Sequence, residues 1–315
     1  MNILQLDKNH PLISEQLSAK GFVVEEDHTS GYDEVLEKIR NYDGIIIRSR
    51  IPLDKNFLEK SSHLKFIARV GAGMENIDVE TAKKLNIELI NSPEGNRDSV
   101  AEHVLGMLLI LMNRLFIASN EVKNGIWKRE ENRGDELLGK TFGIIGYGNM
   151  GKAVAKRLSG FGCRVIFHDI LPNLSDEFAV QVSLDELKNE ADILSLHIPI
   201  TPETFHLIDS EFISGMQKNF YFVNTARGKN VKTKDLVEAI KSGKIKGAAL
   251  DVLEYEKSSF ENLNASDTKE NEDLQFLLNS EKVIVTPHIA GWTVQSKEKL
   301  AQFIVDKILQ LFLLQ

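Results

Sequence analysis

The chain has 315 residues, which corresponds to two domains at roughly 150 residues each. Hydrophobic residues make up 42% and charged residues 27%, a mixture that is typical of globular proteins and excludes a disordered or collagen-like chain. The single cysteine excludes an internal disulfide and a cysteine-rich metal site, and the net charge of -8 argues against nucleic-acid binding, although a local group of arginines can still bind a small anion.

The first ninety residues alternate short apolar runs, rich in Ile and Val, with amphipathic segments. The predicted strands are Ile3–Leu6, Phe22–Val24, Gly44–Ile47, Lys65–Val70 and Ile87–Ile90. The predicted helices between them include Pro11–Ala19, Tyr32–Arg40 and Val79–Leu85. This alternation predicts βαβ units and a parallel sheet.

A longer helix is predicted next, from about Ser99 to Asn124. Its residues are apolar on most faces, so we expect it to be buried between domains or between subunits. The loop that follows it carries Trp127.

A second alternating series covers most of the remaining chain. Its predicted strands are Thr141–Ile145, Arg164–His168, Ile193–His197, Phe220–Asn224, Gly247–Asp251 and Lys282–Thr286. Its predicted helices are Met150–Ser159, Leu184–Asn189, Asp209–Gly215 and Thr233–Ser242. Six strands with helical crossovers predict a doubly wound parallel sheet.

Two segments complete the chain. The acidic stretch Lys257–Asn279, which contains the run Asp267–Asp273, is interpreted as a solvated surface loop. The segment Val294–Leu314 is predicted to form one amphipathic helix.

Neither a signal peptide nor a membrane span is expected. The segment Met1–Asp7 reaches an aspartate before any long apolar stretch, and the most apolar run, Val104–Met112, is about half of the ~20 residues that a spanning helix needs. We therefore expect a cytoplasmic protein that does not bind membranes.

A glycine-rich turn follows the first strand of the second series. Gly146, Gly148 and Gly151 form a G-x-G-x-x-G pattern between a predicted strand and a predicted helix, the context of a dinucleotide-binding loop. The glycines allow the tight turn and the close approach of a pyrophosphate, which the helix N-terminus attracts. Asp169 ends the next strand, where a carboxylate binds the ribose hydroxyls and repels the 2′-phosphate of NADP. The predicted cofactor is therefore NAD.

Three further side chains stand just after predicted strands. They are Arg227, Glu256 and His288. Ligands bind at the carboxyl ends of the strands in such sheets, so we expect the three to converge near the nicotinamide. Histidine can take the hydroxyl proton of a hydroxy acid, a carboxylate can orient the imidazole, and a guanidinium can bind the substrate carboxylate and polarise its keto oxygen. These residues predict hydride transfer from a 2-hydroxy acid.

Several further segments, spread over essentially the whole chain, carry recognisable motifs. They are Arg69–Gly73 with Asn76–Asp78, Asn91–Asn96 with Ser99–Glu102, Asn224–Gly228, Ala248–Glu256 and Thr286–Thr293. With the glycine loop, they make the chain resemble the D-isomer-specific 2-hydroxyacid dehydrogenases. The resemblance implies the catalytic roles above, contact of Asp251 with the nicotinamide, and binding of the substrate carboxylate by backbone at Val70, Gly71, Ala72 and Gly73. It also implies cofactor contacts from Asn149, Met150, Ile198, Pro199, Thr225, Ala226 and Gly291.

The expected architecture is two Rossmann-like or flavodoxin-like doubly wound α/β domains with a cleft between them. We expect a discontinuous substrate-binding domain of residues 1–97 plus 288–315 and an NAD-binding Rossmann domain of residues 98–287. The resemblance implies a homodimer formed through the Ser99–Asn124 helix and the Trp127 loop. His63, His103, His197 and His206 are interpreted as structural, and no metal is expected.

The expected substrate is D-3-phosphoglycerate, oxidised to 3-phosphohydroxypyruvate in serine biosynthesis. Within the family the chain most resembles the phosphoglycerate dehydrogenases, and Arg48, Ser49 and Arg50 end a strand where those enzymes present basic groups to a phosphate. Two positions depart from the usual pattern, Lys257 in place of a proline and Trp292 in place of a small residue. The Ile289–Thr293 tract is similar to that of erythronate-4-phosphate dehydrogenase.

Two alternatives stay open from the sequence. The first is another enzyme of the family, either a glyoxylate/hydroxypyruvate reductase or the erythronate-4-phosphate enzyme, which would share every catalytic residue. The second is an NADH-sensing binding protein of the corepressor type, because such proteins can retain the same three side chains.

Overall fold

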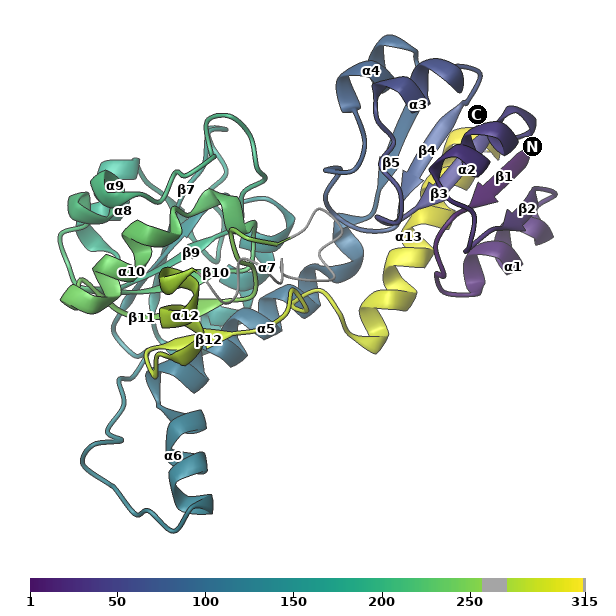
Figure 1. Cartoon of the computed structure of the whole chain (residues 1–315). Helices are drawn as coiled ribbons and strands as arrows, with labels where there is room; N and C mark the ends of the chain where they lie inside the picture. Colours follow the sequence, from purple (N-terminus) through teal and green to yellow (C-terminus); the bar gives the residue numbers. More distant parts are fainter. Residues whose placement is uncertain (257–270, 314–315) are drawn as a thin grey trace. The chain divides into compact units, whose positions relative to one another are not determined.

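The short apolar runs fold into two parallel sheets in the computed structural model, which describes residues 1–256 and 271–313 (Figure 1). The chain divides into unit 1, made of Met1–Arg97 with Trp292–Gln315, and unit 2, made of Asp98–Gly291. Unit 1 is therefore discontinuous, because the chain leaves it and later returns. The predicted class of two parallel-sheet α/β domains is confirmed.

Unit 1 is built on a five-stranded sheet in the order β2-β1-β3-β4-β5. Its strands are β1 Asn2–Gln5, β2 Val23–Glu26, β3 Gly44–Ile47, β4 Phe66–Arg69 and β5 Glu88–Asn91. Its helices are α1 Leu12–Ala19, α2 Tyr32–Lys38, α3 Lys55–Lys60, α4 Val79–Lys84 and α13 Val294–Leu313. The strand order reverses between β1 and β3, and in sheets of this kind ligands bind at the carboxyl ends of the strands beside such a reversal.

Both faces of this sheet are covered, as the continuous apolar strands require. Leu4 and Ile45 lie in a core cluster with residues of α2, α3 and α4. Ile3 and Ile46, their neighbours in sequence, lie in a second cluster with residues of α1 and α13. Side chains alternate between the faces of a strand, so each strand contributes to both cores.

Unit 2 is built on a seven-stranded parallel sheet in the order β12-β11-β10-β9-β6-β7-β8. Its strands are β6 Thr141–Ile145, β7 Arg164–His168, β8 Val180–Gln181, β9 Ile193–Leu196, β10 Phe220–Asn224, β11 Ile245–Leu250 and β12 Val283–Val285. Its helices are α6 Leu115–Lys123, α7 Asn149–Leu158, α8 Leu184–Glu190, α9 Ser210–Gly215, α10 Thr233–Ser242 and α12 Glu272–Asn279, while α5 Pro93–Met112 starts in unit 1. One face carries α5 and α7, and the other carries α8, α9, α10 and α12.

Several predicted elements are corrected. The expected helix Ser99–Asn124 is two helices, α5 and α6, because Arg114 adopts a left-handed φ of 52° between them. A seventh strand, β8, was too short to be predicted from its two residues.

The prediction of a loop over the acidic stretch is also corrected for its described part. The part predicted as loop at Glu272–Asn279 is α12, which buries Leu274 and Leu277. Residues 257–270, with Lys257 and the first part of the acidic run, lie outside the described residues, as does Leu314 of the expected last helix.

Within the described ranges, no single helix is both long and apolar enough to cross a membrane. The pair α5 and α6 meets that test of length and composition only when taken together, with a bend of 59° between them.

Candidate active site

The glycine loop connects the carboxyl end of β6 to α7. It lies beside β9, at the point where the strand order of unit 2 reverses. Gly146 has a φ of +91°, and a Cβ added there would lie 2.5 Å from the carbonyl oxygen of His197. Only glycine allows this approach, which sets the loop at the ligand-binding crevice of the sheet.

The N-terminus of α7 is open to an anion. Gly148 is its N-cap residue, no side chain caps the helix, and a Cβ added to Gly148 would meet no atom within 4 Å. Asn149 and Met150 form the first helical positions. Unpaired N–H groups at a helix start with space beside them suit the pyrophosphate of NAD.

Asp169 follows β7 and binds the glycine loop. One carboxylate oxygen accepts the N–H of Tyr147 at 2.7 Å, and the other accepts the N–H of Leu171 at 2.9 Å. A carboxylate has about four lone-pair directions, so two remain for the ribose hydroxyls of NAD.

The other expected cofactor residues follow β9, β10 and β12. Ile198 and Pro199 stand after β9, Thr225 and Ala226 after β10, and Gly291 after His288. The Thr225 hydroxyl is buried and has no hydrogen-bond partner among the described residues. An orphaned buried hydroxyl at this edge is what a site for a polar cofactor would leave. The residues present therefore fit NAD.

His288 and Glu256 form a direct pair after β12 and β11. Nδ1 of His288 lies 2.8 Å from Oε2 of Glu256, whose other oxygen accepts the N–H of Leu253 at 2.5 Å. Glu256 thus orients the imidazole and favours the tautomer that carries its proton on Nδ1.

Asp251 holds the turn that carries His288. This carboxylate is 1% exposed, and it accepts the Thr286 hydroxyl at 2.6 Å and the N–H groups of Ile289 and Ala290 at 2.8 Å each. Its contact with the nicotinamide stays a prediction. In the structure its side chain anchors the backbone on both sides of His288.

Arg227 stands on a turn after β10 that Asn224 fixes. The Asn224 side chain accepts the N–H of Ala226 at 3.0 Å and donates to the carbonyl of Arg227 at 2.9 Å. A Cβ added to Gly228 would lie 2.0 Å from the Leu253 carbonyl oxygen. The turn that carries Arg227 therefore packs directly on the loop that carries Glu256.

One pair beside these turns was missed from the sequence. His206 Nε2 lies 2.6 Å from Oε1 of Glu254, whose Oε2 accepts the N–H of Thr233 at the start of α10 at 2.9 Å. The available signal was two glutamates at alternate positions after one strand. Glu256 contacts His288, and Glu254 ties the same loop to its neighbours.

Unit 1 places Arg48 at the reversal of its strand order, directly after β3. Its N–H donates to Oδ2 of Asp7, beyond the end of β1, at 2.6 Å. Its guanidinium lies over the indole of Trp292, 4.3 Å from the ring centroid. Ser49 separates it from Arg50.

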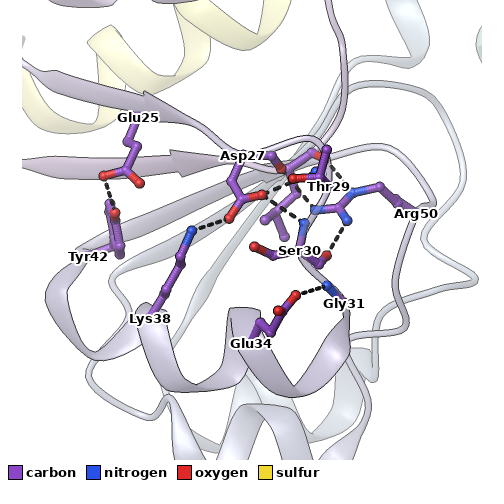
Figure 2. Close-up of polar contacts among 10 residues, drawn as sticks. Glu25, Asp27, Thr29, Ser30, Gly31, Glu34, Lys38, Tyr42 and Arg50 are labelled. Carbon is purple, nitrogen blue, oxygen red and sulfur yellow. Dashed lines mark hydrogen bonds and ion pairs between the residues drawn. The ribbon is translucent and has the colours of Figure 1, made fainter.

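Arg50 has a structural role (Figure 2). It donates to the carbonyls of Leu6 at 2.6 Å, Asp27 at 2.9 Å and Ser30. The Asp27 carboxylate in turn binds Lys38 at 2.5 Å, and this pair holds the pKa of Asp27 well below its usual range. These bonds tie the end of β2 to β3 and argue against the prediction that Arg50 contacts substrate.

The loop after β4 presents backbone donors. The N–H groups of Val70 and Gly71 donate to the carbonyls of Ile47 at 2.8 Å and Arg69 at 2.9 Å. In the described part of the chain the N–H groups of Ala72 and Gly73 have no such acceptor. Two adjacent unpaired N–H groups suit a carboxylate, so this loop remains the predicted carboxylate site.

Comparison with known proteins is consistent with this geometry. Residues 105–290 match the model of the D-isomer specific 2-hydroxyacid dehydrogenase, NAD binding domain. The chain is 37% identical to a hydroxypyruvate reductase of Thermotoga maritima, over 88% of this chain and 87% of that one. It is also 37% identical to a D-3-phosphoglycerate dehydrogenase of Methanocaldococcus jannaschii, over 88% of this chain but only 51% of that relative. A D-lactate dehydrogenase of Aquifex aeolicus, crystallised with NAD and lactic acid, superimposes with a TM-score of 0.83 at 31% identity, covering 99% of this chain and 95% of that one.

Proposed function

The chain belongs to the D-isomer-specific 2-hydroxyacid dehydrogenase family, whose cofactor here is NAD, and we propose that it oxidises D-3-phosphoglycerate to 3-phosphohydroxypyruvate. The observation that carries the choice of substrate is Arg48, a cation at the strand-order reversal of unit 1 and at the position where the sequence predicts a phosphate contact. A similar D-3-phosphoglycerate dehydrogenase, matched over about half of its length, supports it.

In this proposal the three side chains of unit 2 divide the chemistry. His288 takes the substrate hydroxyl proton on Nε2, because Glu256 occupies Nδ1 and stabilises the imidazolium that forms. Arg227 binds the substrate carboxylate and polarises the developing carbonyl. NAD, when bound along Gly146–Gly151 and Asp169, supplies the acceptor for the hydride that leaves C2.

The proposal extends to serine biosynthesis as the pathway, the cytoplasm as the location and a homodimer as the assembly. Support for the dimer comes from α6 and the loop after it, where Phe116 is 70% exposed and Trp127 is 77% exposed. Large apolar side chains grouped on a surface are typical of a protein interface.

A second candidate is reduction of hydroxypyruvate or glyoxylate. The share of each relative's length that the chain matches favours this candidate. The match covers 87% of the Thermotoga hydroxypyruvate reductase but only about half of the archaeal phosphoglycerate dehydrogenase. The two candidates share the reaction type and differ in whether the substrate carries a phosphate.

A substrate panel tests the proposal by NADH formation with D-3-phosphoglycerate, D-glycerate and D-lactate, and by NADH consumption with hydroxypyruvate and glyoxylate. We expect the highest kcat/KM for the phosphorylated acid. The variant His288→Ala should lower kcat by about 10²–10⁴-fold, the usual contribution of a general base, and leave NAD affinity unchanged. His28→Ala, at a surface position beside Glu26, is the matched control.

Three outcomes would contradict parts of the proposal. Equal or faster turnover of unphosphorylated acids favours the second candidate. Loss of NAD binding in His288→Ala assigns that residue to the cofactor. Tight NADH binding without turnover of any 2-hydroxy or 2-keto acid favours the NADH-sensing binding protein.

A further inference from the structure

His206 contacts two of the segments that carry the proposed catalytic side chains of unit 2. Its backbone N–H donates to the carbonyl of Lys229 at 2.9 Å, in the turn that follows Arg227. Its ring Nε2 lies 2.6 Å from Oε1 of Glu254, in the loop that also carries Glu256. All of these residues belong to unit 2. His206 therefore joins the Arg227 turn to the Glu256 loop through separate backbone and side-chain contacts.

Glu254 is bonded through both of its carboxylate oxygens. Oε1 lies against His206, and Oε2 accepts the N–H of Thr233 at 2.9 Å, at the start of α10. The side chains of His206 and Glu254 are only 28% and 20% exposed. Because a single residue separates Glu254 from Glu256, the bonds of Glu254 limit where the Glu256 carboxylate can lie.

The Glu256 carboxylate depends on the shape of this loop. Its Oε1 accepts the N–H of Leu253 at 2.5 Å, and its Oε2 lies 2.8 Å from Nδ1 of His288. Both oxygens are thus in use, one within the loop and one on the imidazole. A shift of the loop would move the carboxylate away from His288 and change the orientation of the ring.

The segment 199–208 holds His206 in an uncommon conformation. His206 has a left-handed φ of 53°, which few residues with a Cβ adopt. Asn230, which is completely buried, donates from its side chain to the carbonyls of Pro199 at 3.3 Å and Thr204 at 3.1 Å. These bonds and the one to Lys229 maintain the segment in this form. Backbone strain that several bonds maintain is typical of functional segments.

We propose that His206 is a positioning residue for the reaction, which holds the loop of Glu256 through Glu254 so that Glu256 orients the imidazole of His288. From the sequence His206 was interpreted as structural only. In this inference its effect on the reaction is transmitted by Glu254 and Glu256. The inference rests on the proposed function for the roles of Glu256 and His288, and not for the choice of substrate.

The test compares two variants of His206 that carry the same amide group at different reach. In His206→Gln the amide nitrogen corresponds to ring Nε2 and can donate to Glu254, whereas in His206→Asn it corresponds to ring Nδ1 and is too short. Asparagine tolerates a left-handed φ and keeps the backbone N–H, so His206→Asn removes the ring contact without adding strain. His28→Asn, which breaks a His–Glu pair in unit 1, is the matched control.

Steady-state kinetics use the 2-hydroxy or 2-keto acid of the substrate panel that wild type converts with the highest kcat/KM, at saturating cofactor. We expect His206→Asn to lower kcat about tenfold, less than the ~10²-fold cost of misplacing catalytic groups by about 1 Å. The KM, and the NAD affinity measured by isothermal titration calorimetry, should stay within about twofold of wild type. His206→Gln should recover most of the loss in kcat, and His28→Asn should have wild-type kinetics.

A double-mutant cycle shows whether His206 acts through Glu256. Glu256→Gln removes the charge that orients His288. In that background His206→Asn should lower kcat by less than about twofold, because the carboxylate that it positions is already absent. Residues that act independently would instead give the full tenfold loss in both backgrounds.

Three results would contradict the inference: wild-type kcat in His206→Asn, equal losses in His206→Asn and His206→Gln, or an undiminished loss in the Glu256→Gln background. Each leaves the proposed function standing, since that function is measured on wild type. If wild type converts no 2-hydroxy or 2-keto acid, the proposed function fails and the inference fails with it.

Discussion

Among individual residues, His197 packs against the glycine loop and makes the stability of unit 2 depend on pH. Its carbonyl faces Gly146, its Nε2 lies 2.9 Å from the Ser195 hydroxyl, and burial lowers its pKa from 6.5 to about 3. In the unfolded chain a histidine titrates near its ordinary pKa of about 6.5. The unfolded state therefore binds an extra proton between about pH 6.5 and pH 3, and stability falls as the pH decreases through that window.

We predict that the free energy of unfolding decreases below about pH 6.5, by up to about 1.4 kcal/mol per pH unit from this group. His197→Asn, which keeps a partner for Ser195, should reduce the slope between pH 6.5 and pH 4. Urea unfolding followed by circular dichroism at several pH values measures it, with His28→Asn as control. Asp27 is buried, pairs with the exposed Lys38 and has a lowered pKa, so its contribution to stability is lost only below about pH 4, outside the range from pH 6.5 to pH 4. An unchanged slope in His197→Asn would contradict the assignment.

The site residues could be predicted from the sequence mainly where a reactive side chain directly follows a predicted strand. His288 and Glu256 were expected to meet, and they are 2.8 Å apart, because β11 and β12 are neighbours and the carboxyl ends of parallel strands share one edge. The stack of Trp292 on Arg48 and the pair His206–Glu254 could not be predicted. Both join distant segments through side-chain geometry that no periodicity encodes.

Between elements, Gly228 packs closely on the loop after β11 and so ties the turn of Arg227 to the loop of Glu256. A Cβ at this position would lie 2.0 Å from the carbonyl oxygen of Leu253 and 2.1 Å from its carbon, so backbone would have to move. The movement would displace the turn of Arg227 relative to the loop of Glu256.

We predict that Gly228→Ala lowers kcat/KM by about 10²-fold, the cost of misplacing catalytic groups by about 1 Å. Gly160→Ala, where an added Cβ would meet nothing within 4 Å, is the matched control and should keep wild-type activity. Steady-state kinetics and thermal unfolding of both variants make the comparison. Wild-type kinetics in Gly228→Ala would show that the two turns tolerate separation.

Strands were predicted more accurately than helix ends. Buried parallel strands are continuous apolar runs, so β3, β6, β7 and β10 have the predicted bounds. The break at Arg114 could not be predicted, because no residue in this stretch requires Arg114 to adopt a φ of 52°. The acidic composition of its surroundings led to a loop being predicted in place of α12. The helical signal was the spacing of three between Leu274 and Leu277, which are both buried.

For the whole molecule, the exposed apolar side chains of α6 and of the loop after it concern the oligomeric state. It exposes Leu115, Phe116, Val122, Ile126 and Trp127 by 42–77%. Exposed apolar side chains of this size are unfavourable in water, and we propose that a second copy of the chain covers them.

We predict that wild type is a dimer and that Trp127→Glu shifts it toward monomer, because a charge would be buried without a partner. Light scattering after size-exclusion chromatography measures the mass of each. Ile170→Glu, at a position 94% exposed in the same unit, is the control and should remain dimeric. A monomeric wild type would remove the proposed assembly.

The placement of α13 in unit 1 has a consequence for synthesis on the ribosome. Ala301, Ile304, Val305 and Ile308 of this helix complete the core over one face of a sheet whose strands lie within the first ninety-one residues. That sheet is made first, but α1 covers only part of this apolar face, and the rest stays exposed until α13 emerges, after all of Asp98–Gly291. Unit 2 can therefore fold as a continuous segment before unit 1 does, and the N-terminal strands are exposed to aggregation and to chaperones in that interval.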